Sequence, residues 1–167
     1  LISDPFVQQS AAAVVVETGF WEDPEEYPGM AHFVEHLLFM GTKTYPKEAE
    51  YSQFIKDHQG LENAFTSTDK TVYMFSIETE AYKLALDRFS HFFIDPLFSI
   101  NCISRELYAV DQEHAKNIEN DIQRQYMVLK ETGNPDHPNH NFSCGNRETL
   151  SRIPLSVLQD WYRTHYS

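Results

Sequence analysis

Residues 60–79 read GLENAFTSTDKTVYMFSIET, and this stretch decides the fold class because it predicts two neighbouring strands. Its second half alternates, with Tyr73, Phe75 and Ile77 pointing to one side, as in a strand that buries one face. The letters STDK are polar and predict a turn, so NAFTS before them is a second extended stretch. We therefore expect an antiparallel or mixed sheet.

The flanking sequence adds another strand and several helices. Residues 11–20, AAAVVVETGF, form a short β-branched run that predicts a buried strand. Apolar spacing of three and four residues predicts helices. They cover residues 30–39, 47–58, 80–93 and about 104–129, with a last one after Pro154. The pattern predicts one α+β domain over residues 1–167, with helices packed on one face of the sheet.

Composition excludes several classes of function. The net charge is −12 and the pI is about 5.0, which argues against nucleic acid or anionic membranes as partners. No run of 18 apolar residues is present, so no membrane span is expected. Cys102 and Cys144 form no CxxC pair and predict free thiols, which favours a reducing compartment. We expect a cytoplasmic location, and a periplasmic or organellar location is the alternative. The chain opens on LISDP without Met, so we expect a natural N-terminus further upstream.

The letters HFVEH at residues 32–36 form the pattern His-x-x-Glu-His inside an apolar helical stretch. Residues four apart share a helix face, so His32 and His36 can bind one metal ion, with Glu35 beside them. Zinc suits such a pair, and a neighbouring carboxylate can take a proton from water. The alternative is two surface histidines and a solvated Glu. Polar groups that interrupt an apolar helix need partners, which favours the metal site.

A catalytic zinc site needs a third protein ligand. The letters RELYAVDQEH place Glu106 and Glu113 seven residues apart on one helix face, with Asp111 nearby. An inward carboxylate needs a cation or hydrogen-bond donors, whereas an outward one is simply solvated. Spacing within the helix does not choose among Glu106, Asp111 and Glu113.

The remaining motifs carry less chemistry. His137 and His140 lie in a proline-rich stretch without a matching acid, and we expect them to be structural. The sequence has no glycine-rich phosphate loop and no G-x-S-x-G elbow, so phosphoryl transfer and serine hydrolase chemistry lack support.

The whole pattern resembles the pitrilysin and insulysin family of zinc metallopeptidases. That family has H-x-x-E-H followed, after 76 intervening residues, by a glutamate ligand, and here that position is Glu113. GMAHFVEHLLFMGTKTYPKEAEYSQF, ENAFTS and RELYAVDQEHAKN also resemble family segments. The resemblance implies that His32, His36 and Glu113 hold one zinc ion. It also implies that Glu35 is the general base and that Glu106 supports the site.

The resemblance extends to substrate binding. It implies that a peptide adds as an extra strand along Asn63 and Ala64, and that Phe39 and Phe65 form an apolar pocket beside the scissile bond. One aromatic common near the zinc site in the family stands here as Gln123.

Family members are built from several such domains in two halves. The resemblance therefore implies that this chain is an incomplete N-terminal domain, without its opening strand and without the C-terminal half that contacts substrate. We expect it to bind zinc but to have little or no peptidase activity alone. The alternatives are a non-catalytic relative with the same fold and a metal-binding module without hydrolysis.

Overall fold

The computed structural model describes residues 1–166, which form a three-stranded sheet and seven α-helices. The strands are β1 Gln9–Val16, β2 Leu61–Thr66 and β3 Thr71–Glu78. The α-helices are α1 Met30–Leu38, α2 Glu50–Asp57, α3 Tyr82–Ile94, α4 Ile100–Ile118, α5 Asp121–Glu131, α6 Arg147–Leu150 and α7 Leu155–His165. Three short 3₁₀ helices connect them: η1 Phe20–Glu22, η2 Thr79–Ala81 and η3 Pro138–His140.

The sheet is antiparallel throughout, with strand order β1-β3-β2. β2 and β3 form the predicted hairpin, in which Ala64 lies opposite Tyr73 and Thr66 opposite Thr71. Within the described residues β2 pairs only with β3, so one side of its backbone is free of strand partners. β2 is therefore an edge strand.

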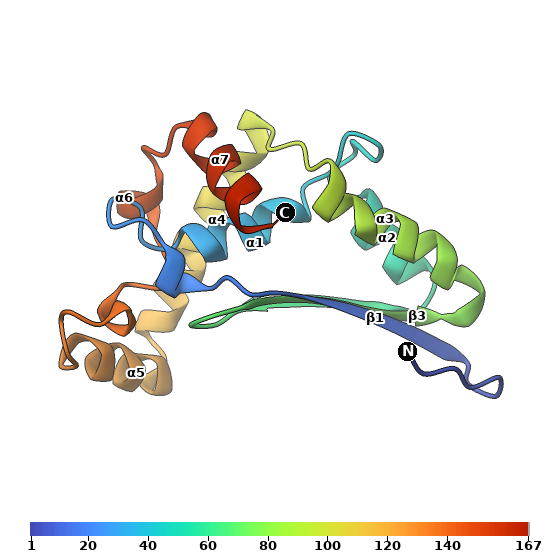
Figure 1. The fold of residues 1–167 in the computed structure, drawn as a ribbon, viewed down its shortest axis with the longest axis horizontal. Coiled ribbons are helices and arrows are strands. Elements are labelled where there is room, and N and C mark those ends of the chain that lie inside the picture. The colour runs from blue at the N-terminus through green and yellow to red at the C-terminus, as the bar shows by residue number, and fades with distance from the viewer. Residues whose placement is uncertain (167) are drawn as a thin grey trace.

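The helices cover one face of the sheet, as predicted (Figure 1). Tyr73, Phe75 and Ile77 of β3 are all buried in the core that this packing creates. α1 lies inside that core, and most of its side chains are buried. On the opposite face of the sheet, Leu61 and Phe65 are exposed. The core thus forms between the sheet and the helices, and it holds α1 against β2.

The prediction of one helix over residues 104–129 was wrong. α4 begins earlier and ends at Ile118, and α5 begins at Asp121 after a break at Asn120. The Asn120 side chain accepts hydrogen bonds from the backbone N–H groups of Ile122 and Gln123. Asparagine favours this capping position because its side chain replaces hydrogen bonds that the first helical turn cannot make. The helix therefore restarts in a new direction.

Among residues 1–166, no helix combines the length and the apolar character that crossing a bilayer requires.

Candidate metal centre

Two glycines and an aspartate position the helix that carries the HFVEH motif. Asp23 accepts hydrogen bonds from the backbone N–H groups of Gly29 and Ala31, at 2.7 and 2.8 Å, at the start of α1. Gly29 and Gly145 both have positive φ, at 95° and 75°, and their backbones touch. A Cβ on Gly29 would lie 2.3 Å from the Cα of Gly145. Only glycine allows this approach, which brings the Cys144–Gly145 segment against α1.

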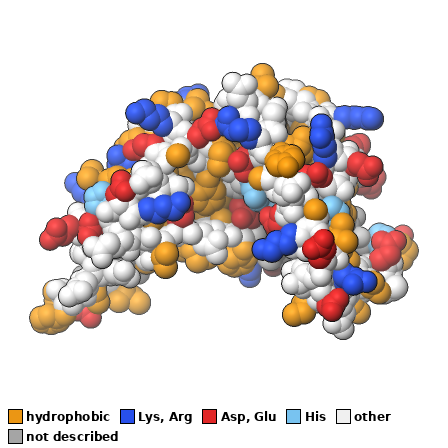
Figure 2. All heavy atoms as spheres, turned by 180° about the vertical axis from the view of Figure 1, so that it is seen from behind, with side chains coloured by type: hydrophobic (Ala, Val, Ile, Leu, Met, Phe, Trp, Pro, Cys, Tyr) orange, Lys and Arg blue, Asp and Glu red, His pale blue; other side chains and the backbone are white. Residues whose placement is uncertain are grey.

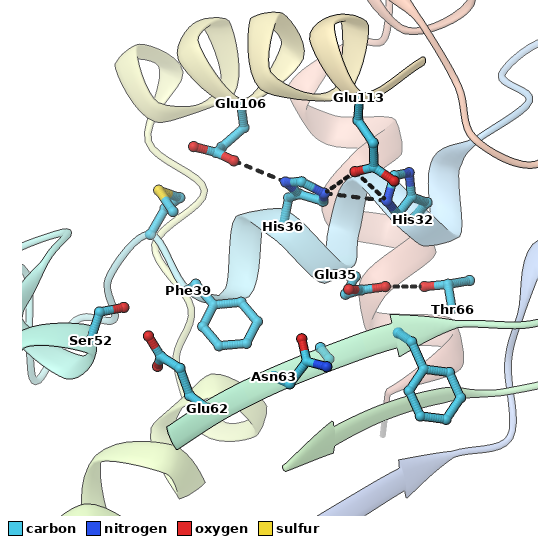
Figure 3. A pocket seen from close by; sticks show the side chains of 13 residues that line it. His32, Glu35, His36, Phe39, Ser52, Glu62, Asn63, Thr66, Glu106 and Glu113 are labelled. Carbon is cyan, nitrogen blue, oxygen red and sulfur yellow. Dashed lines mark hydrogen bonds and ion pairs between the residues drawn. The ribbon is translucent and has the colours of Figure 1, made fainter. Parts of the chain in front are cut away.

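The described residues contain one group of three side chains that could hold a metal ion: His32, His36 and Glu113. The two Nε2 atoms lie 3.2 Å apart. Oε2 of Glu113 lies 3.5 Å from Nε2 of His32 and 3.6 Å from Nε2 of His36. Ligands about 2.0–2.1 Å from one tetrahedral zinc ion are separated by roughly 3.3 Å. The three atoms therefore have the spacing of three zinc ligands, and Figure 3 shows them facing one another.

The outer nitrogens of both imidazoles are engaged. Nδ1 of His32 lies 2.6 Å from the carbonyl oxygen of Cys144, and Nδ1 of His36 lies 3.1 Å from Oε2 of Glu106. A carbonyl or an ionised carboxylate can only accept, so each Nδ1 is the donor. Each neutral imidazole then directs its Nε2 lone pair toward Glu113. Two lone pairs and a carboxylate that converge in this way can hold a metal ion between them.

The electrostatics of the site favour positive charge at this point. Burial lowers the pKa of His32, but hydrogen bonds to Cys144 and Glu113 outweigh burial and raise it well above the usual range. Hydrogen bonds from His32 and His36 hold the pKa of Glu113 well below that of an ordinary glutamate. The surroundings thus favour positive charge where the three side chains meet, which a bound proton or a divalent metal ion would supply.

Glu35 is the buried acid of the motif, with 8% of its surface exposed. It leaves α1 toward β2, where the hydroxyl of Thr66 donates a 2.5 Å hydrogen bond to its Oε2 (Figure 3). Burial raises the pKa of Glu35, and the Thr66 hydrogen bond and the two histidines partly oppose that rise. Glu35 is therefore a poor metal ligand by position but a well-held proton acceptor.

The metal centre opens into a cavity of about 520 Å³ between α1, α4 and the edge strand β2. Figure 2 shows the molecule hollowed on this side, with acidic, histidine and hydrophobic side chains exposed in the hollow. Met40, Ser52, Glu62 and Thr66 line the cavity although they were not predicted. Thr66 could have been found from the sequence, because it shares a strand face with Ala64.

The structure brings the site residues that the resemblance implies to this cavity, from three elements or their ends. His32, Glu35 and His36 come from α1, Phe39 from its C-terminus, Glu106 and Glu113 from α4, and Asn63, Ala64 and Phe65 from β2. Phe39 packs against Tyr51 and Phe92. Phe65 is 44% exposed and alternates with Ala64 and Thr66, so its ring projects toward the opposite face of the sheet. The pocket role of Phe65 stays a prediction, and its orientation does not favour it.

The other histidines make structural contacts. His140 lies in η3 and contacts the carbonyl oxygen of Lys130, and His137 caps η3. Gln123, the departure noted in the sequence, lines a neighbouring cavity of about 360 Å³ that also reaches His32 and Glu113. Both cysteines are free, as predicted.

A family model described as "Insulinase (Peptidase family M16)" matches residues 1–136. The chain belongs to peptidase family M16. It is 51% identical to an insulin-degrading enzyme of Mus musculus, over 100% of this chain and 17% of that protein. It is 43% identical to a putative zinc protease, mug138, of Schizosaccharomyces pombe, over 100% of this chain and 18% of that protein.

The chain resembles the crystal structure of pitrilysin with a TM-score of 0.94 and 38% identity. The match covers 99% of this chain and 18% of that chain. The α+β fold and the family resemblance inferred from HFVEH are therefore confirmed. The chain spans less than a fifth of the length of these relatives.

Proposed function

We propose that this chain is the zinc-binding catalytic domain of an endopeptidase that hydrolyses small or unfolded peptides. The observation that carries the proposal is the convergence of His32 Nε2, His36 Nε2 and Glu113 Oε2, with Glu35 beside them. The names of the relatives, which include insulin-degrading enzymes and a zinc protease, support the same class of reaction.

One zinc ion fits this donor set, because two imidazoles and a carboxylate leave a fourth position open. When bound, zinc supplies Lewis acidity, which acidifies water and polarises the scissile carbonyl group. Glu35 takes the proton of the attacking water and delivers it to the departing amine. Thr66 holds the carboxylate of Glu35, and Glu106 and the Cys144 carbonyl hold the two imidazoles in the orientation that ligation needs.

The substrate is proposed to bind along β2. Among residues 1–166 the outer edge of β2 has no strand partner, and alternate residues of the segment around Asn63 and Ala64 present backbone N–H and C=O groups there, with which an extended peptide can pair as an added strand. This pairing would align the peptide bond beside Glu35 without requiring a particular side chain. Phe39 would then contact a substrate side chain in the cavity.

The test is the Glu35→Gln substitution in the full-length protein, assayed with a quenched fluorescent peptide. We expect cleavage to fall by about 10²–10⁴-fold, the usual loss when a general base is removed, while zinc content stays unchanged. A chelator should abolish wild-type cleavage. Glu80→Gln is the matched control, because Glu80 is exposed and does not line the cavity. Undiminished cleavage by Glu35→Gln would refute this mechanism, whereas absence of cleavage by the zinc-loaded wild-type protein would favour a metal-binding module without hydrolysis.

We also infer that the 167-residue chain alone has little or no peptidase activity, because the relatives that it matches carry much more chain. A C-terminal half of the same protein would supply further substrate contacts. Comparison of the chain and the full-length protein at equal zinc occupancy tests this. Equal turnover by both would show that residues 1–167 suffice.

A further inference from the structure

One acidic side chain in the cavity has no role in the mechanism above. Glu62 shares the inner face of β2 with Ala64 and Thr66, because alternate residues of a strand face the same way. Thr66 donates a hydrogen bond to Glu35. Glu62 lies four residues before Thr66 in the strand, a distance of roughly 14 Å at about 3.4 Å per residue. Its carboxylate points into the cavity beside Phe39 and Ser52 (Figure 3).

Glu62 differs from the other cavity carboxylates in having no partner. Thr66 bonds Glu35, His36 bonds Glu106, and both histidines contact Glu113. In residues 1–166, by contrast, Oε2 of Glu62 is buried and makes no hydrogen bond. A buried carboxylate oxygen without a donor is costly, so this group calls for a partner from outside the described chain.

A second polar group nearby is also without a partner. The hydroxyl of Tyr51 is buried and makes no hydrogen bond within the described residues, and Tyr51 as a whole is 4% exposed. Its ring packs against Phe39, which lines the cavity. Burial raises the pKa of Tyr51, and the negative charge of Glu62 raises it further.

The charge of the cavity indicates what kind of group would fit. Four glutamates line it, and none of the lining side chains in the part of the chain described here is Lys or Arg. A ligand with several N–H donors and a positive charge would pair Oε2 of Glu62, and its aliphatic or planar portion would pack on the Phe39 ring. Arginine and lysine side chains have these properties.

We propose that Glu62 is a specificity-determining residue that selects a basic side chain in the substrate, within about three residues of the cleaved bond. This inference rests on the proposed peptidase function and on strand pairing along β2. In that arrangement the substrate strand lies beside β2. A substrate side chain on the inner face, next to the N-terminal end of β2, is then the neighbour of Glu62. An arginine there would pair with a carboxylate oxygen that makes no hydrogen bond within residues 1–166.

The experiment compares peptides that differ only by arginine or citrulline, which is isosteric but uncharged, at each position around the cleaved bond. At one position, the full-length protein should cleave the arginine peptide about tenfold better in kcat/KM, as for one partly buried charged hydrogen bond. Glu62→Gln should bring this ratio close to one. Glu62→Lys should favour a glutamate peptide over the arginine peptide. The control variant Glu80→Gln removes the same charge from an exposed site and should keep the wild-type ratio.

A ratio that is the same in Glu62→Gln as in the wild type would overturn the inference, as would a wild-type protein that cleaves both peptides equally at every position. A solvated carboxylate without a role predicts that second result. Binding of the same peptides to Glu35→Gln, measured by fluorescence anisotropy, gives a readout that needs no turnover. If neither the wild type nor any variant cleaves a peptide, but substitution of Glu62 still removes the preference for binding the arginine peptide, the peptidase proposal fails and charge selection by Glu62 stands.

Discussion

Removal of the Glu106 carboxylate is expected to weaken zinc binding without removing a ligand. Oε2 of Glu106 accepts a 3.1 Å hydrogen bond from Nδ1 of His36, and the two side chains are only 15% and 23% exposed. A hydrogen bond to a charged group contributes about 1.5–3 kcal/mol, which corresponds to roughly a 10–150-fold change in an equilibrium constant. Glu106→Ala should therefore raise the zinc dissociation constant by about 10–100-fold, the range for residues that orient metal ligands.

Glu106→Gln separates charge from geometry. The glutamine retains an oxygen that can accept from His36 at the same reach, so only the charge is lost, and we expect a change of about tenfold at most. Zinc affinity would be measured by competition with a chromogenic chelator near neutral pH. Glu113→Ala, which removes a ligand, should weaken zinc binding more than either Glu106 variant. Glu119→Gln, at the exposed end of α4, is the control for charge alone.

Two results would refute this reasoning. If Glu106→Ala binds zinc as tightly as the wild type, the contact with His36 does not orient the imidazole. If Glu106→Ala binds as weakly as Glu113→Ala, Glu106 is itself a ligand and the assigned set of His32, His36 and Glu113 is wrong.

Three further predictions concern the scaffold. Gly29→Ala should lower the free energy of unfolding by at least about 2 kcal/mol in urea titrations, because the added Cβ meets the Gly145 backbone and residue 29 has a positive φ. Unchanged stability would mean that the segments around Gly29 and Gly145 separate easily. Asn120→Ala should cost about 1 kcal/mol in the same assay, because the α5 cap is lost, while zinc affinity stays the same. Burial lowers the pKa of Lys130 to about 8, below its unfolded value, so the unfolded chain binds more protons than the folded chain above pH 8. The free energy of unfolding of the wild type should therefore rise between pH 8 and 9.5, by about 1–2 kcal/mol relative to Lys130→Met. Parallel pH profiles of these two proteins would contradict the shift.

Local pattern predicted the β2–β3 hairpin well, because alternation and turn chemistry act over a few residues. The break between α4 and α5 was missed although its signal is local. Asn120 stands before Asp121 at the start of a new helical turn, which is a capping pattern, but the helical spacing appears continuous across it. The capping pattern predicts a new helix at Asp121, whereas the apolar periodicity predicts one continuous helix. The side-chain hydrogen bonds of Asn120 favour the new helix.

Sequence by itself determined the part of the site that lies within one helix turn. His32 and His36 share a face of α1 because an α-helix places residues four apart side by side, and Glu35 follows from the same geometry. The choice of Glu113 over Glu106 came from the family spacing, since both lie on one face of α4 and helix periodicity does not separate them.

Only the tertiary structure decided what holds those residues. The contacts of Glu35 with Thr66, His36 with Glu106 and His32 with the Cys144 carbonyl join positions 31, 70 and 112 residues apart. The last of these contacts depends on a backbone oxygen and on the approach of two glycines, which residue types do not reveal. Residue types also do not reveal that Oε2 of Glu62 makes no hydrogen bond within residues 1–166. Whether a carboxylate is satisfied depends on every segment packed around it, and that is known only once the chain is folded.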